Sequence, residues 1–238
     1  MRKYLLATTC IVALGGGAAS AADLPLKGAP VAAFNWTGGY IGGHIGVARM
    51  NSECMATGYS YYSCGSSGGV GTIRDTNFAA GVRVGYDWQI DRSFVVGAVA
   101  DWTWTNLNRT HVDNSYTLKA KIDWLASFRG RAGLAFDRTM VYVTGGLALA
   151  RVQAEGNLIS GAYLYSQLDK TAVGWVAGVG IEHHLASMPR WSVNAEVLYY
   201  DLGRHDGGTA CGGCSSYTYQ NEYHFEVFEA RVGVNYRF

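Results

Sequence analysis

Hydrophobic and polar positions alternate in the closing stretch of the chain, from Val227 to Phe238. Read in twos, one row is apolar and the other largely polar: Phe228, Ala230, Val232, Val234, Tyr236 and Phe238 against Val227, Glu229, Arg231, Gly233, Asn235 and Arg237. Successive side chains of a strand point to opposite faces, so this pattern predicts a strand with one apolar and one wet face. Its length is about that needed to cross a bilayer at a tilt.

The same alternation recurs in earlier segments, at 36–49, 78–90, 94–107, 118–136, 140–153, 171–185 and 191–201. Long polar loops at 50–76, 108–116, 154–169 and 202–221 alternate with short turns at 91–93, 137–139 and 186–190. This order predicts an all-β fold, an eight-stranded antiparallel up-and-down transmembrane β-barrel with short periplasmic turns and long exterior loops. A closed ring leaves no unpaired strand edge in hydrocarbon. The alternative is a soluble barrel of the lipocalin type, which would have to bury charged residues or flip every row.

Aromatic residues lie near many of the predicted strand ends, where they suggest girdles at the two membrane interfaces. They are Trp88, Trp102, Trp104, Trp124, Trp175, Trp191, Tyr86, Tyr199, Tyr236 and Phe238.

The beginning of the chain has a different pattern. Arg2 and Lys3 precede a short apolar run, and Ala19-Ser20-Ala21 is a small-residue cleavage site, which predicts a signal peptide over residues 1–21. Residues 22–35 hold two of the three prolines and show no period, so we expect a short periplasmic lead-in. The barrel domain would then occupy residues 36–238.

Composition narrows the class of protein. The chain has 32 glycines and 3 prolines, which fits tightly curved sheets better than disorder. Loss of the two basic residues of the signal takes the formal charge from +1 to −1, so there is no basic excess to hold nucleic acid. No apolar run after the signal is long enough for a membrane helix.

Charged residues on the polar rows would point into the barrel. They are Arg83, Asp87, Asp101, Lys121, Asp123, Arg129, Arg131, Glu182, Glu196, Glu229 and Arg231. An eight-stranded lumen is only just wide enough to be filled by its own side chains, and charges away from water need partners. We therefore expect a salt-bridged plug; a narrow conducting path is the alternative.

Four cysteines remain after the signal: Cys54, Cys64, Cys211 and Cys214. An even number in an exported chain favours disulfides, and of three possible pairings proximity favours Cys54 with Cys64 and Cys211 with Cys214. A zinc site at these thiols is the alternative, although we expect no metal and no cofactor. His205-Asp206 beside Ser215 or Ser216 could suggest a hydrolase, but no motif fixes that geometry, so we predict no catalytic residues and no enzyme activity.

The chain also resembles a known family, the small alphaproteobacterial outer-membrane β-barrel proteins related to the OmpA-type barrel domain. The resemblance lies in Ala22-Asp23-Leu24-Pro25, in the opening strand Phe34-Asn35-Trp36-Thr37-Gly38-Gly39-Tyr40-Ile41-Gly42-Gly43 and in the ending Arg231-Val232-Gly233-Val234-Asn235-Tyr236-Arg237-Phe238. It implies that Val234, Tyr236 and Phe238 form the signal read by the barrel-assembly machinery. The loop cysteines depart from the family pattern.

The resemblance implies a bacterial outer-membrane location, with outer-membrane lipids and the assembly machinery as partners. Members are described as surface antigens and envelope-integrity proteins, sometimes as porins or haem binders. We therefore expect a structural, envelope-integrity and surface-interaction role; the alternatives are a narrow porin for small solutes and a receptor for haem or host ligands. A receptor would use tyrosines of the long loops: Tyr59, Tyr61, Tyr62, Tyr163, Tyr165, Tyr217 and Tyr219.

Overall fold

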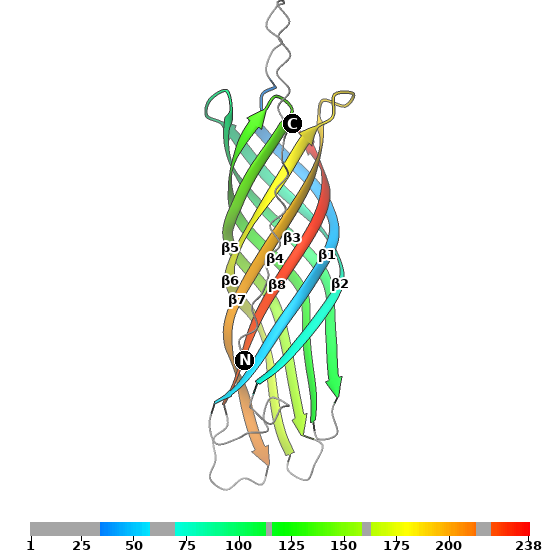
Figure 1. The fold of residues 1–238 in the computed structure, drawn as a ribbon, viewed down its shortest axis with the longest axis vertical. Coiled ribbons are helices and arrows are strands. Elements are labelled where there is room, and N and C mark those ends of the chain that lie inside the picture. Colours follow the sequence, from blue (N-terminus) through cyan, green and yellow to red (C-terminus); the bar gives the residue numbers. More distant parts are fainter. Residues whose placement is uncertain (1–33, 58–69, 113–115, 159–162, 213–219) are drawn as a thin grey trace, which may run out of the picture. The chain divides into compact units, whose positions relative to one another are not determined.

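The computed structural model describes residues 34–57, 70–112, 116–158, 163–212 and 220–238. They form the strands β1 (Gly38–Thr57), β2 (Val70–Gln89), β3 (Phe94–Val112), β4 (Tyr116–Phe136), β5 (Thr139–Leu158), β6 (Tyr163–His184), β7 (Trp191–Gly212) and β8 (Gln220–Arg237). Each strand pairs antiparallel with its neighbour in sequence, and β8 returns to pair with β1 (Figure 1). The predicted closed eight-stranded antiparallel barrel is confirmed.

Tight turns join the strands at one end of the barrel. In the turn after β2, the backbone N–H groups of Ser93 and Phe94 donate to Asp91 Oδ1 at 2.8 and 2.7 Å and lower the pKa of that carboxyl group. Asp137 begins the turn between β4 and β5 with a φ of 54°, in the left-handed region that Asp tolerates better than most residues. In the part of the chain that is described, no helix is long and apolar enough to cross a membrane.

The strands are longer than the sequence pattern predicted. The expected loops at 50–76, 108–116, 154–169 and 202–221 are largely strand, because β1 continues to Thr57, β3 to Val112, β5 to Leu158 and β7 to Gly212. A barrel strand needs about 9–11 residues to cross a bilayer. The strands of this barrel have between 18 and 22 residues, about twice that length.

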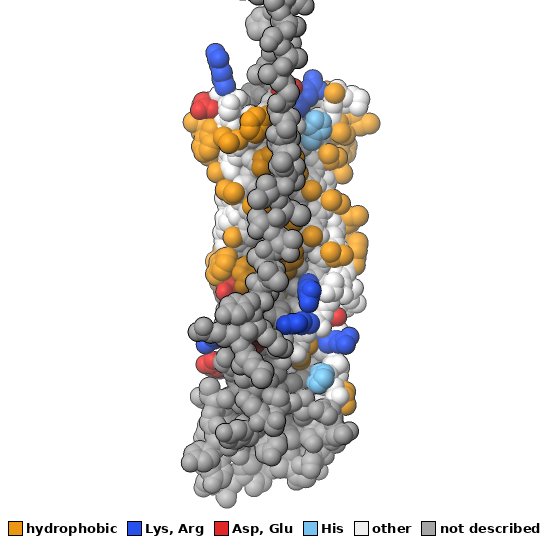
Figure 2. Space-filling view, viewed as in Figure 1, with side chains coloured by type: hydrophobic (Ala, Val, Ile, Leu, Met, Phe, Trp, Pro, Cys, Tyr) orange, Lys and Arg blue, Asp and Glu red, His pale blue; other side chains and the backbone are white. Residues whose placement is uncertain are grey.

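The outer surface of the turn half is apolar. Side chains such as Val84, Val143, Val179 and Val232 are half exposed there. Figure 2 shows hydrophobic side chains gathered over this half on the face that it draws. An exposed apolar surface of this extent is unsuited to water.

The two rows of each strand exchange character about halfway along. On β8 the inward row changes from Arg231 and Glu229 to Val227 and Phe225, while the outward row changes from Phe228 to Glu226. On β1 the outward row likewise passes from Ile45 and Val47 to Arg49, Asn51 and Glu53, and the inward row ends in Met50 and Cys54. The turn half is thus apolar outside and charged inside, and the other half is the reverse.

A buried apolar cluster fills the barrel in this second half. Its members include Met50, Leu107, Ile122, Leu125, Val152, Leu198, Tyr200, Leu202, Tyr223, Phe225 and Val227. Apolar inside and polar outside is the pattern of a soluble β-barrel, so this half matches the lipocalin alternative locally although the whole barrel does not.

Aromatic side chains border the apolar band on both sides. At the turn end Trp191 packs against Tyr236, with ring centroids 5.3 Å apart. At the opposite border Trp102 stacks on Trp124 at 4.4 Å, and Trp175 packs on Tyr199 at 5.5 Å. Two such girdles mark the interfaces of a membrane barrel.

Candidate functional site in the barrel lumen

Ten charged side chains are buried inside the turn half. They are Arg83, Arg129, Arg131, Arg231, Arg237, Asp87, Asp101, Glu182, Glu196 and Glu229. Five are positive and five negative, so the buried charges of the described residues sum to zero. Inward positions receive these residues because the polar row of each strand faces the lumen.

Lys121 and Asp123 were predicted to face the lumen, and the structure corrects this. A bulge on β4 between Ile122 and Leu125 adds one residue, so the side chains of Ile122 and Leu125 both point inward. Lys121 and Asp123 therefore lie on the outer surface, with side chains 38% and 30% exposed and Nζ 2.6 Å from Oδ1. The other nine predicted charges are buried in the lumen.

Arg237 is the lumenal charge that sequence reasoning missed. It lies on the polar row of β8, six residues after Arg231, and the alternation alone could have found it. Its Nη1 donates to Asp87 Oδ2 at 3.0 Å, and its Nη2 donates to the carbonyl of Trp36 at 3.1 Å.

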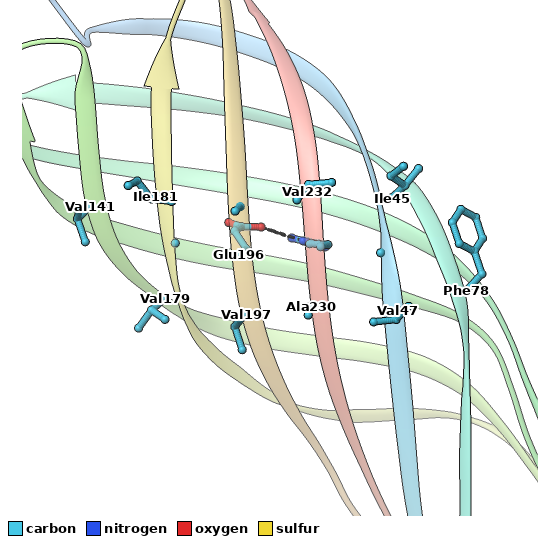
Figure 3. A pocket seen from close by; sticks show the side chains of 14 residues that line it. Ile45, Val47, Phe78, Val141, Val179, Ile181, Glu196, Val197, Ala230 and Val232 are labelled. Atoms are coloured by element: carbon cyan, nitrogen blue, oxygen red, sulfur yellow. Dashed lines mark hydrogen bonds and ion pairs between the residues drawn. The ribbon is translucent and has the colours of Figure 1, made fainter. Parts of the chain in front are cut away.

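Glu196 on β7 is the centre of one group of charges. Arg83 Nη2 and Arg231 Nε each donate to its Oε2 at 2.8 Å, and the hydroxyl of Tyr142 donates to Oε1 at 2.8 Å. Arg129 Nη1 is 3.5 Å from the same Oε1. The contact between Glu196 and Arg231 joins β7 to β8, and Figure 3 draws it as a dashed line from Glu196. The carboxylate of Glu196 thus forms ion pairs with three guanidinium groups.

Asp101 on β3 shares two of these arginines. Arg129 Nη2 lies 2.8 Å from its Oδ2, and Arg231 Nη1 lies 3.1 Å from its Oδ1. Ser127 Oγ adds a hydrogen bond of 2.7 Å. Glu229 is bound more loosely, 3.6 Å from Arg231 Nη1, although the Tyr200 hydroxyl donates to it at 2.9 Å.

A second group lies nearer the turns, around Arg131 on β4. This guanidinium forms an ion pair with Asp87 on β2 and lies 2.9 Å from Glu182 Oε2 on β6. The rings of Tyr40 and Tyr142 lie 4.7 and 5.1 Å from its central carbon, close enough for cation–π contact. Residues from four other strands, β1, β2, β5 and β6, therefore contact this one arginine.

Trp36, just before β1, closes the turn end of the lumen. It is fully buried, and its indole N–H donates to the carbonyl of Asp137 at 3.1 Å. Phe34 and His184 pack against its ring at centroid distances of 5.4 and 4.7 Å. Arg237 lies over it at 5.4 Å. These contacts place an aromatic layer between the charges and the turn end of the barrel.

Other predicted residues have different positions. Cys54 is buried in the apolar cluster, whereas Cys64, Cys214 and the side chain of Cys211 lie outside the described part, so the disulfide pairing stays a prediction. The loop tyrosine side chains, Ser215 and Ser216 and the signal peptide also lie outside it. Val234, Tyr236 and Phe238 form the last apolar row, with Phe238 80% exposed; their recognition by an assembly machinery stays a prediction.

Known proteins resemble this chain over most of its length. The outer membrane protein beta-barrel domain family matches residues 9–238. The 31 kDa outer-membrane immunogenic protein of Brucella melitensis biotype 1 is 31% identical over 250 residues, covering 100% of both chains. The 25 kDa outer-membrane immunogenic protein of Brucella abortus biovar 1 is 25% identical, over 90% of this chain and 84% of its own. Among solved structures, the outer membrane protein OprG from Pseudomonas aeruginosa is similar with a TM-score of 0.48 and 13% identity, over 85% of this chain and 97% of its own.

Proposed function

This chain belongs to the outer membrane protein β-barrel domain family, and on that premise we propose that it is a non-conducting barrel that acts through its surfaces. It resides in the bacterial outer membrane. Its proposed role is structural, in envelope integrity, with the connections opposite the turns presented to the outside. The observation that carries the proposal is the lumen filled by five buried arginines and five buried carboxylates.

Three successive layers support a closed lumen. The Trp36 layer lies at the turn end. The charges form the next layer along the barrel axis, and the apolar cluster around Leu125 and Phe225 lies beyond the charges, farthest from the turns. An ion entering the charged layer would have to displace paired groups whose separation costs several kcal/mol. An ion entering the apolar layer would lose its hydration without gaining any partner.

Planar-bilayer conductance of the refolded protein tests closure. We expect silent bilayers under conditions in which a known porin conducts. Stable steps whose ion selectivity changes with Glu196→Gln would assign the current to this lumen and overturn the proposal. If the conductance steps are unaffected by this variant, a mock preparation without the protein shows whether they come from a contaminant. Steps that require the protein would also overturn the proposal.

The envelope role has its own test in cells. A strain lacking the protein should become more sensitive to detergents and large antibiotics, and both the wild-type chain and a folded lumen variant should restore resistance. Unchanged sensitivity of the deletion strain would contradict the structural role.

Surface presentation follows from the names of the relatives, which describe outer-membrane immunogenic proteins. We extend this property to the present chain. Antibodies against the connections opposite the turns should label intact cells, and labelling that requires permeabilised cells would refute it.

A further inference from the structure

A shallow apolar groove of about 720 Å³ crosses the outer surface over β5, β6, β7, β8, β1 and β2. The small side chain of Ala195 lies between Ile181 and Val232 in the strand register. Ala230 lies between Val197 and Val47 (Figure 3). This difference in size leaves the hollow. The groove lies within the apolar band, where its surroundings are hydrocarbon.

A polar pocket of about 320 Å³ adjoins the groove on the side away from the turns. It is lined by Arg49, Asn51, Arg74, Tyr199, Glu226 and Phe228. Arg49 follows the groove residue Val47 by two positions, and Phe228 precedes Ala230 by two, so each pair lies along one face of its strand. The apolar groove therefore leads into the polar pocket. Figure 2 shows basic side chains at this border of the hydrophobic band.

Among the described residues, the two arginines of this pocket have no carboxylate partner to neutralise their positive charge. Arg74 Nε donates to the neutral Asn51 Oδ1 at 3.2 Å, and among the described residues neither Arg49 nor Arg74 forms an ion pair with a carboxylate. Elsewhere at this end of the barrel, Lys119 and Arg151 each have an acidic partner, at 3.4 and 3.2 Å.

The one carboxylate of the pocket is already engaged. The Tyr199 hydroxyl donates to Glu226 Oε1 at 2.8 Å, and Asn51 Nδ2 donates to Oε2 at 3.1 Å. Asn51 in turn holds Arg74, so Glu226 positions the basic side rather than neutralising it by direct contact. Two guanidinium groups against one carboxylate leave the pocket with a net positive charge.

We propose that the pocket and the groove together bind one phosphate-bearing lipid of the outer leaflet. Its phosphate would lie on Arg49 and Arg74, and an acyl chain would lie along the groove past Ala230. Guanidinium groups bind phosphate through paired, charge-assisted hydrogen bonds, and the pocket lies at the border where lipid headgroups meet hydrocarbon. The side follows from the rule that short turns face the periplasm. The inference rests on the outer-membrane location and does not require a closed lumen.

Native mass spectrometry of the detergent-purified full chain tests this with diphosphoryl lipid A as the probe. We expect one bound molecule with an affinity about tenfold or more above that of the dephosphorylated lipid, because hydrogen bonds between charged groups are lost with the phosphate. Arg49→Gln with Arg74→Gln should lower the affinity to that of the dephosphorylated lipid. Ala230→Trp, which fills the groove, should weaken the binding of both lipids.

The matched control is Lys119→Gln with Arg151→Gln, which also removes two positive charges from this end of the barrel. It should bind lipid A like the wild type, and a heat-dependent shift in gel mobility checks that each variant is folded. The comparison of the two lipids on the wild-type chain needs no variant.

Four results would each overturn the site: equal binding of both lipids, unchanged binding by the Arg49 and Arg74 variant, equal loss in the control, or displacement by inorganic phosphate alone. Binding confined to a dimer would make the groove an interface between two copies instead. Conductance and lipid binding are separate measurements, so a conducting barrel could still confirm the lipid site.

Discussion

Replacement of Glu196 by glutamine removes one buried charge while keeping the shape of the side chain. Glu196 accepts hydrogen bonds from Arg83, Arg231 and Tyr142, each at 2.8 Å, inside a lumen where the ten buried charges of the described residues sum to zero. The substitution leaves the lumen with a charge of +1. It also turns an amide NH₂ group, which can only donate, toward guanidinium groups that can only donate.

The expected loss is large because the remaining charges stay buried. Breaking a buried pair by removing one partner typically costs about 3–5 kcal/mol, and we expect a decrease of this size in the free energy of unfolding. Glu229→Gln is the matched control in the same lumen. Glu229 lies 3.6 Å from its arginine, and a glutamine oxygen can still accept from the Tyr200 hydroxyl, so the expected loss is about 1 kcal/mol.

Urea unfolding of the refolded barrel in lipid vesicles, followed by tryptophan fluorescence, measures both values. Adding Arg83→Gln to Glu196→Gln restores a lumen charge of zero and should recover part of the loss, since the only described ion pair of Arg83 is with Glu196. Glu229→Gln also leaves the lumen at +1, so if Glu196→Gln costs no more than Glu229→Gln, the reasoning from close ion pairs is refuted. If the double variant is less stable than the sum of the single effects predicts, the charge-balance reasoning is refuted.

The same unfolding assay checks three further predictions. Trp36→Ala should cost about 3 kcal/mol by emptying the turn end of the lumen. Gly97→Ala should cost about 1–3 kcal/mol, because the new methyl group would lie 2.2 Å from Asp87 Oδ1, whereas Gly130→Ala, whose nearest neighbour is 3.9 Å away, should change little. Val143→Arg on the apolar band should cost about 2–4 kcal/mol, and Gln153→Arg on the polar half should cost about 0.5 kcal/mol or less.

The alternation of side chains was sufficient to predict the barrel and the orientation of most rows. On β5, within the segment 140–153 where alternation was predicted, Val141, Val143 and Leu147 face outward and are about half exposed. The row ending at Phe238 also faces outward as predicted. These predictions worked because an outer surface in hydrocarbon imposes one simple requirement on every second residue.

The same reasoning fails where the surrounding solvent changes. Beyond Arg49 on β1 the outer residues are polar, so the apolar outer row ends there and the pattern predicts a loop for the residues that follow. The strand continues to Thr57 with its rows exchanged. The bulge near Ile122 is the second source of error, because a single extra residue reverses the alternation without any glycine or proline to mark it.

The point at which the rows exchange gives the depth of the membrane in the barrel. Arg49 on β1 pairs with Phe228 on β8 and with Thr76 on β2, and all three lie at the border of the apolar band. From Phe228 to Phe238 is about ten residues, which is the length of one tilted crossing. The remaining strand residues are therefore not needed to cross hydrocarbon. They build a second barrel segment whose polar outer surface is suited to water and whose interior is apolar. This segment places the bases of the connections opposite the turns about 20 Å beyond the hydrocarbon, since a strand rises about 3.3 Å per residue.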